Sequence, residues 1–371
     1  MSSSAMRRRA AWVPNSTTTV PSPRASAWAS PSDIPPAGRQ SRGPFGGPLR
    51  MFRVAHRRAS CQKRAMAQTS LTPRASAELL LLGTIWGGSF LANGLALPQA
   101  GVAGTVAVRV GGAALVLWVA VRLLGLAVPR SLRIWASFLV MGLLNNVIPF
   151  TLITWGQQSI PSGLASILNA ATAIFGVLVA SLVLADERLT PRRIAGVLLG
   201  FAGVVTTIGP DALTGFDPRS AGQLALLGAA LSYACAGAFG RRALAGLDPR
   251  MAAAGMLTGA SLIVLPAALL LGGPPRLDLS LQAWGALFYL AVVASAFAYL
   301  LYYRILAVAG AGNLSLVTLI VPPVAILLGA LVLGERLPPH AFAGFGLLVA
   351  GLLVLDGRIL HIPRELVRRA R

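Results

Sequence analysis

Between residues 77 and 359 the chain is almost continuously apolar, and short polar stretches divide this region into ten segments. A helix rises about 1.5 Å per residue, so roughly 20 apolar residues are needed to cross about 30 Å of hydrocarbon. A water-soluble core has no room for ten such segments, so the bilayer is predicted to surround most of the chain. The predicted spans are residues 76–95, 103–124, 134–154, 162–184, 192–209, 221–239, 251–272, 282–303, 312–334 and 341–357.

The composition supports the same class, because 55% of the 371 residues are hydrophobic and only 12% are charged. In lipid, a spanning backbone must satisfy its own hydrogen bonds, and the alternating pattern of a transmembrane barrel is absent from this sequence. We therefore predict an all-α integral membrane protein. The two cysteines, Cys61 and Cys235, predict neither a disulfide nor a metal site.

The formal net charge of +21 would suggest nucleic-acid binding in a soluble protein, but here the basic residues follow the predicted topology. Outside the N-terminal tail, fifteen of them fall in the even-numbered loops and the C-terminal tail. The odd-numbered loops hold only Arg219, Arg276 and Arg336. Since basic residues favour the cytoplasmic side, both termini are predicted to be cytoplasmic, and no nucleic-acid partner is expected.

Two parts of the sequence resemble each other. Residues 182–189 read LVLADERL and residues 331–337 read LVLGERL, and the segments that follow also match, IAGVLLGFAGV at 194–204 with AGFGLLVAG at 343–351. Each half holds five spans, and because five is odd the second copy must be inverted relative to the first. We predict one five-helix repeat at 76–209, a linker at 210–220 and a second repeat at 221–359. Inverted repeats of this kind are typical of secondary transporters.

Several features together resemble a known family. They are Trp-Gly-Gly-Ser-Phe at 86–90, Arg109 in the second span, the two Glu-Arg-Leu endings and the Gly-rich fifth and tenth spans. Their order and spacing resemble the EamA-like branch of the drug/metabolite transporter superfamily, over about residues 77–359. The resemblance implies ten helices, cytoplasmic termini, a central cavity between the halves, and movement of small metabolites or drugs. One position departs from the family pattern, because the fourth span has Ala173 where the ninth has Pro322.

Arg109 is the single charged residue well inside a predicted span. A charge at this depth costs roughly 2.5–3.5 kcal/mol on insertion scales, so its side chain should face a watery cavity or a partner. One interpretation is an anchor for an anionic group such as a carboxylate, for which the guanidinium offers a planar fork of donors. The other interpretation is snorkelling, in which the side chain reaches the headgroups from about seven residues inside the span.

Uncharged polar and aromatic residues complete the candidate substrate site. Such groups often only hydrogen-bond neighbouring helices, but as a set they suit a cavity for small polar or amphipathic solutes. Asn169 and Thr318 occupy matching places in the two repeats, as alternating access would use. The predicted substrate-binding residues are Trp86, Asn93, Arg109, Asn146, Asn169, Tyr233, Tyr299 and Thr318.

The sequence contains no constellation for catalysis. It has no phosphate-binding loop, no cluster of metal ligands and no Ser/His/Asp set within the spans, so we predict no enzyme, no cofactor and no metal. All eleven acidic residues fall in tails, loops or span ends, which leaves facilitated or exchange transport at least as plausible as proton coupling. Glu187 and Glu335 are expected to pair with a neighbouring arginine or hold a turn. Gly196, Gly200 and Gly203 are expected to allow close helix packing.

Residues 1–75 are rich in Ser, Pro, Ala and Arg and cannot build a core. Three interpretations remain open for this tail. It is an upstream over-extension with Met66 as the real start, an organellar transit peptide, or a disordered basic arm that touches anionic headgroups. Residues 360–371 form a second basic tail.

The predicted function is secondary transport of small metabolites or drugs, with export preferred by resemblance alone. The substrate is expected to be of amino-acid, nucleoside or amphipathic drug type, in a bacterial inner (plasma) membrane, and the protein a monomer or a homodimer. Two other classes of protein are alternatives to a transporter. An intramembrane enzyme acting on lipid phosphates would need acids and bases gathered on one face, and a scaffold or receptor would need sizeable extramembrane domains; neither is found in this sequence.

Overall fold

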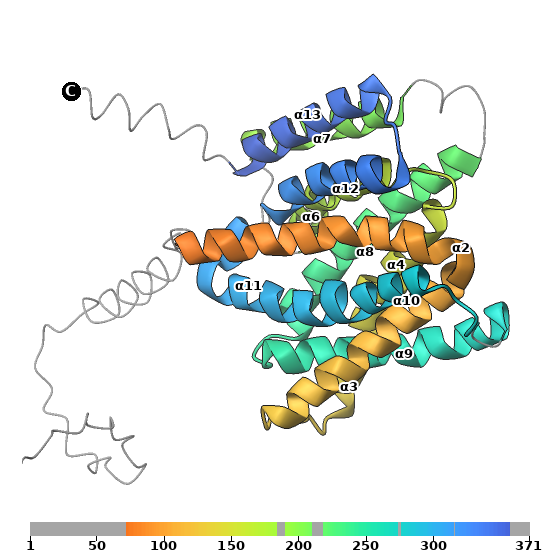
Figure 1. The fold of residues 1–371 in the computed structure, drawn as a ribbon. Coiled ribbons are helices and arrows are strands. Elements are labelled where there is room, and N and C mark those ends of the chain that lie inside the picture. The colour runs from red at the N-terminus through yellow and green to blue at the C-terminus, as the bar shows by residue number, and fades with distance from the viewer. Residues whose placement is uncertain (1–71, 184–189, 210–217, 274–275, 315, 357–371) are drawn as a thin grey trace, which may run out of the picture. The chain divides into compact units, whose positions relative to one another are not determined.

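A computed structural model describes residues 72–183, 190–209, 218–273, 276–314 and 316–356, which belong to one compact unit. The predicted basic tails lie almost wholly outside these ranges, as do most of the predicted linker and Glu187. Within the described ranges the chain is entirely helical (Figure 1). The elements are α2 (Pro73–Leu123), α3 (Leu132–Gly142), η1 (Leu143–Val147), α4 (Ile148–Gly156), α5 (Ser162–Asn169), α6 (Thr172–Val183), α7 (Pro191–Ile208), α8 (Pro218–Ala243), α9 (Pro249–Gly272), α10 (Leu281–Phe288), η3 (Tyr289–Phe297), α11 (Ala298–Leu314), α12 (Val317–Leu333) and α13 (Pro339–Asp356).

These elements include seven helical stretches long and apolar enough to cross a membrane, and two shorter apolar helices, Val317–Leu333 and Pro339–Leu355. Large apolar side chains such as Leu115, Leu270 and Leu331 are exposed on the outside of the described fold. So many exposed leucines are not expected on the surface of a water-soluble protein, because they would form large apolar patches. The outer surface is therefore suited to lipid, as the sequence predicts.

The first helix, α2, is 51 residues long and joins two of the predicted segments. At about 1.5 Å per residue a straight helix of this length would be more than twice as long as the hydrocarbon core is thick. Gly101 breaks it, with φ 66° and ψ 176°, a backbone conformation that only glycine adopts readily. The chain turns back at this point (Figure 1), so that Gly83 of the first arm lies against α12 and Gly112 of the second lies against η3.

Helix α2 begins at Pro73, slightly before the predicted boundary at residue 76. The Thr72 side chain accepts a hydrogen bond from the Ala75 amide, and a proline follows at the first helical position. Both features favour a helix start, since Thr satisfies a free amide and proline has none to satisfy. The same Thr-Pro pattern begins α7, where Thr190 caps the helix ahead of Pro191. The helix itself therefore begins three residues before the predicted first span.

The fourth predicted span is broken although it lacks the proline found in the ninth. Helix α5 ends at Asn169 and α6 begins at Thr172, and the Thr172 hydroxyl donates to the Asn169 carbonyl at 2.7 Å. Several backbone bonds around the break span three residues rather than four, for example from the Ala173 amide to the Ala170 carbonyl. A tighter 3₁₀-type turn can therefore produce the break without proline. In the ninth span, Pro322 and Pro323 lie inside α12.

Helix α11 continues to Leu314, so the predicted loop at residues 304–311 is wrong. After Arg304 this stretch reads ILAVAGA, which is apolar and contains no proline, so the helix can continue through it. The next helix, α12, begins at Val317.

Two π-helical stretches interrupt the long helices, η1 in the third predicted span and η3 in the eighth. Residues 143–147 of η1 correspond in the internal repeat to residues 292–296, which lie within η3. A π-helix widens the turn and shifts the direction of the side chains that follow, and such stretches are frequent at functional sites. The sequence analysis did not predict either of them.

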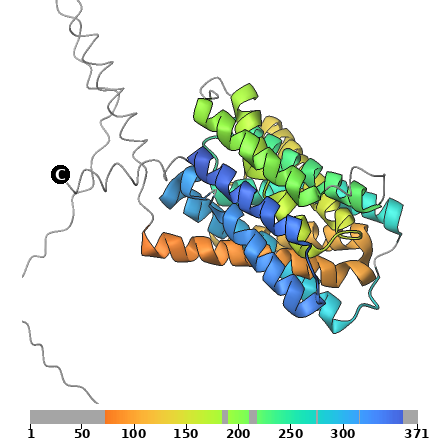
Figure 2. The same cartoon turned by 90° about the horizontal axis from the view of Figure 1, so that it is seen from above.

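Helices α7 and α13 pack side by side in antiparallel orientation (Figures 1 and 2). Gly196, near the start of α7, lies against Gly351 near the end of α13, and Gly203 lies against Gly344 near its start. A Cβ atom on Gly203 would be 2.6 Å from a backbone nitrogen of α13. The prediction that these glycines allow close helix approach is confirmed.

Candidate functional site

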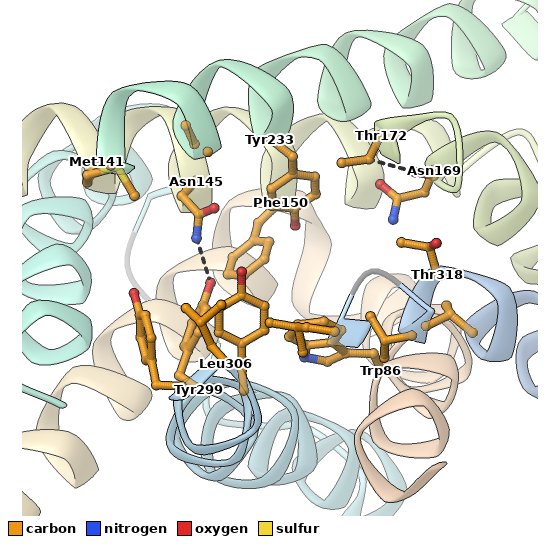
Figure 3. Close-up of a pocket in the computed structure, with 18 of the residues that line it drawn as sticks. Trp86, Met141, Asn145, Phe150, Asn169, Thr172, Tyr233, Tyr299, Leu306 and Thr318 are labelled. Carbon is orange, nitrogen blue, oxygen red and sulfur yellow. Dashed lines mark hydrogen bonds between the residues drawn. The ribbon is translucent and has the colours of Figure 1, made fainter. Parts of the chain in front are cut away.

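A cavity of about 740 Å³ lies among the helices of both halves (Figure 3). Its walls come from both arms of α2, from α3, η1 and α4, and from parts of α5, α6, α8, α9, η3, α11 and α12. The lining is mostly apolar and aromatic with a few polar groups, which is the usual character of a small-molecule site. Seven of the eight predicted residues line it, namely Trp86, Asn93, Arg109, Asn169, Tyr233, Tyr299 and Thr318.

Arg109 is buried, with 6% of its surface exposed, and its guanidinium points into the protein. Its Nε donates to the Ser295 hydroxyl at 3.1 Å, and its Cζ lies 3.7 Å from the centre of the Phe150 ring. The first contact fixes one edge of the guanidinium, and the second is a cation–π interaction on one face. Of the two interpretations of Arg109, these contacts favour the one in which the side chain faces the cavity, because the guanidinium is buried against Ser295 and Phe150.

Asn145, Asn146 and Tyr299 form a hydrogen-bonded cluster between η1 and α11. The Asn145 amide donates to the Tyr299 hydroxyl at 3.0 Å, and this hydroxyl donates to the Asn146 side-chain oxygen at 2.8 Å. Asn145 and Tyr299 line the cavity (Figure 3), whereas Asn146 is fully buried behind them. The structure thus places Asn146 as a support for Tyr299 rather than on the cavity wall.

Aromatic side chains form one wall of the cavity. The Trp86 indole donates to the Ala294 carbonyl at 3.2 Å, next to the serine that holds Arg109. Its ring lies 5.7 Å from that of Tyr302, which in turn packs edge-on against Tyr303. Tyr233 lines the cavity from α8. These rings offer flat apolar surfaces of the kind on which an amphipathic solute can stack.

Asn169 and Thr318 lie near each other across the cavity, one at the end of α5 and the other in the first turn of α12 (Figure 3). The Asn169 side-chain oxygen is buried and has no hydrogen-bond partner among the described residues. The side-chain oxygen of Asn93 is also buried without a hydrogen-bond partner among the described residues, although the side-chain amide nitrogen of Asn93 donates to Gln157 at 3.1 Å. Buried polar atoms are nearly always paired, so these two oxygens are available to a bound molecule.

The site also contains residues that sequence reasoning did not select. Phe150, Tyr302 and Tyr303 could not be distinguished from packing aromatics, because their spacing is that of any apolar helix. Ser295 was one polar residue among many, and its role depends on a contact with Arg109 across 186 positions of sequence. The repeat carries a partial signal, since Phe150 corresponds to Tyr299 and Asn146 to Ser295.

A hydrogen-bonded cluster centred on Gln157 lies next to Phe90 and Asn93, two residues that line the cavity. The Gln157 amide donates to the Phe90 carbonyl at 2.9 Å and to the Ser162 hydroxyl at 3.1 Å. Glu335 then accepts from the backbone amides of Ser162 at 2.8 Å and Gly163 at 3.2 Å. A carboxylate at a helix N-terminus satisfies free amides and complements the helix dipole. Glu335 was expected to pair with an arginine or hold its own turn, and instead it caps a helix of the other half.

One end of the cavity reaches the loop between α8 and α9, where Arg241, Leu247 and Pro249 belong to its lining. Glu78 pairs with Arg304 at 3.0 Å and with Arg74 at 3.1 Å, linking the start of α2 to α11. Arg74, Arg241 and Arg304 all lie in segments that the sequence analysis predicts to be cytoplasmic. The cavity lining thus reaches the arginine-rich side at the loop between α8 and α9, whereas Gln157 and Glu335 lie outside the lining beyond Asn93.

Among the described residues there is no group of three or more His, Cys, Asp or Glu side chains suited to a metal ion. Cys235 is a free thiol. The cavity has the features of a solute-binding site, and the lipid-facing helices around it define a multi-pass membrane transporter.

Comparison with known families agrees with this class. Residues 76–209 and 220–355 match the EamA-like transporter family, and the chain therefore belongs to that family.

Several relatives with names that indicate a function share moderate sequence identity with the chain. The chain is 29% identical over 213 residues to a "Probable amino-acid metabolite efflux pump" of Escherichia coli (strain K12), covering 55% of this chain and 70% of the relative. It is 28% identical over 290 residues to a "Probable terminal-alkyne amino-acid exporter" of Streptantibioticus cattleyicolor, covering 77% and 95%. A solved crystal structure with 20% sequence identity has a TM-score of 0.56 and covers 76% of this chain and 96% of that one, which shows a shared fold.

Proposed function

We propose that the protein is a secondary transporter that exports small organic metabolites by alternating access. The observation that carries this proposal is the cavity of about 740 Å³, with a few polar groups in its lining, which reaches the loop between α8 and α9 on one side and is bordered by the Gln157 and Glu335 cluster on another. A carrier needs such a site accessible from one side at a time. The eight predicted residues would bind the substrate, Asn146 through Tyr299 and the other seven directly.

Ten spanning helices in two inverted repeats are the architecture we propose. The turn at Gly101 supports counting α2 as two spans, which raises nine helical stretches to ten. The antiparallel packing of α7 on α13 supports the inversion, because these are the fifth helices of the two halves. The matching positions of η1 and η3 support the duplication.

We further propose that the protein lies in a bacterial cell membrane with both termini in the cytoplasm. The distribution of arginines supports this orientation. In this orientation the cavity extends toward the cytoplasm, and Glu335 and Gln157 close it on the outer side. This is the state in which an exporter would load its substrate, and the printed names of two relatives, an efflux pump and an exporter, support the direction.

The test is an efflux assay with a matched pair of variants. The full chain is expressed in a bacterium lacking its own exporters, and loss of preloaded solutes of amino-acid, nucleoside and drug type is followed. Ala173→Trp fills the cavity from α6, whereas Leu182→Trp places the same side chain at an exposed position on the same helix. We expect Ala173→Trp to abolish efflux and Leu182→Trp to retain it, at equal amounts in the membrane.

Two results would count against the proposal. One is absence of efflux for every solute by a correctly inserted wild-type protein. The other is unchanged efflux in Ala173→Trp, which would mean that solutes do not pass through this cavity.

A further inference from the structure

The charges of the cavity are strongly unbalanced. Arg109 lies at its centre and Arg241 belongs to the lining at the loop end, whereas none of the described residues that line it is Asp or Glu. The five acidic residues that the structure describes lie at helix ends or in loops. Arg109 has no salt bridge within the described part of the chain. An isolated charge in a poorly hydrated interior is costly unless something of opposite charge is bound.

The guanidinium of Arg109 is held in place but not saturated. The Ser295 hydroxyl accepts a hydrogen bond from Nε, and the Phe150 ring covers one face of the guanidinium. Neither Nη group has a hydrogen-bond acceptor among the described residues. These two groups, on a side chain held on one edge and one face, form the pair of donors that matches a carboxylate. The guanidinium is therefore preorganised for binding an anion.

Apart from Arg241 at the loop end, the remainder of the cavity lining carries no charged side chain. Its walls are the rings of Trp86, Tyr233 and Tyr302 together with aliphatic side chains, and its unpaired atoms are the carbonyl oxygens of Asn93 and Asn169. These oxygens accept a hydrogen bond from an N–H or O–H group. They do not neutralise a positive charge, and no described carboxylate is present to do so.

Charge balance then distinguishes two kinds of ligand. A monocarboxylate with no other charge cancels the charge of Arg109. A zwitterionic amino acid cancels it and adds an ammonium group that finds only neutral acceptors and aromatic faces. Since burying an ammonium group without a counter-ion is unfavourable, the neutral balance is preferred.

We propose that the site selects amphipathic monocarboxylates whose nitrogen, where present, is uncharged, of the N-acyl-amino-acid kind. Arg109 binds the carboxylate, an asparagine oxygen accepts the amide N–H, and the aromatic wall packs the apolar body. The proposal rests on the proposed function, because it assigns the substrate class of the same cavity. It makes Arg109, Ser295 and Phe150 the residues that determine charge specificity.

The first experiment measures binding of three probes to the full purified chain in detergent, by titration calorimetry. The probes are N-acetyl-L-phenylalanine, L-phenylalanine and N-acetyl-L-phenylalaninamide, which share one body and carry a net charge of about −1, 0 and 0 at neutral pH. We expect N-acetyl-L-phenylalanine to bind most tightly and each of the others to bind at least about tenfold more weakly.

The variant arm separates charge recognition from folding. Arg109→Gln is expected to weaken binding of N-acetyl-L-phenylalanine by about 30-fold or more. Arg122→Gln removes an exposed arginine from the same helix and is expected to leave it unchanged. Arg109→Lys keeps the charge without the fork and should recover part of the affinity, which a merely structural role would not predict.

Each contrary result has a clear meaning. Equal binding of L-phenylalanine would show a zwitterion site, and equal binding of the amide would show that the carboxylate is not recognised. No binding of any probe by folded protein would also overturn the substrate class. The efflux assay is scored separately, so that export of a neutral or cationic solute would reject this inference while leaving the transporter function in place.

Discussion

The contact between Glu335 and the start of α5 predicts a measurable shift in which side of the cavity is accessible. Glu335 accepts from two backbone amides, at 2.8 and 3.2 Å, and joins the end of α12 to the opposite half. Hydrogen bonds to a charged group contribute about 1.5–3 kcal/mol each, and part of this is recovered by water when the contact opens. Glu335→Ala should therefore remove about 2 kcal/mol from the state closed at this end. If the contact exists only in that state, the balance shifts about 30-fold toward opening.

The assay is labelling of a cysteine in the cavity from outside the cell. Ser89→Cys is introduced into a chain in which Cys61 and Cys235 are replaced by alanine, and a membrane-impermeant maleimide is added to intact cells. We expect faster labelling in Glu335→Ala, while Arg336→Ala, which alters an exposed neighbour, serves as the control. Equal labelling rates in Glu335→Ala and its parent, at equal expression, would refute the role of this contact in closure.

Two further predictions concern stability. Gly203→Ala places a Cβ 2.6 Å from the nearest backbone atom of α13 and should lower the free energy of unfolding by about 1–3 kcal/mol. Gly346→Ala has open space around the new Cβ and should leave the stability unchanged. Thermal unfolding in detergent compares the two variants. Asp248 caps α9, and hydrogen bonds from Arg250 lower its pKa from 3.8 to about 2. The contribution of the Asp248 carboxylate to stability is therefore complete above about pH 4 and is lost only as the pH falls toward 2. Asp248→Ala should thus lower the unfolding temperature by the same amount at every pH from 5 to 8, corresponding to about 1 kcal/mol. A pH-dependent difference in that range would contradict the assignment.

Much of the candidate site could be predicted because a polar residue in a membrane helix has few places to point. Trp86, Asn93, Tyr233 and Thr318 were selected for their chemistry within apolar segments, and the structure brings them to one cavity. For Arg109 the sequence left two directions open, since a side chain near a span end can reach water either way. Only the packing of η3 beside α2, which brings Ser295 to the guanidinium, fixed the direction.

The sequence by itself determined the membrane class, the apolar segments, the duplication and the suitability of the α7 glycines for close packing, although not the helix that they contact. These are local properties, since segment length, hydropathy and small-residue spacing are written in consecutive residues. Only the tertiary structure decided the π-helical stretches, the break after Asn169 without a proline, the ring of Phe150 on Arg109, and the capping of α5 by Glu335. Each depends on what the rest of the fold places beside a residue, such as the 173 positions of sequence between Ser162 and Glu335. Local sequence cannot encode such a partner, because the free energy of the contact exists only once both halves are packed together.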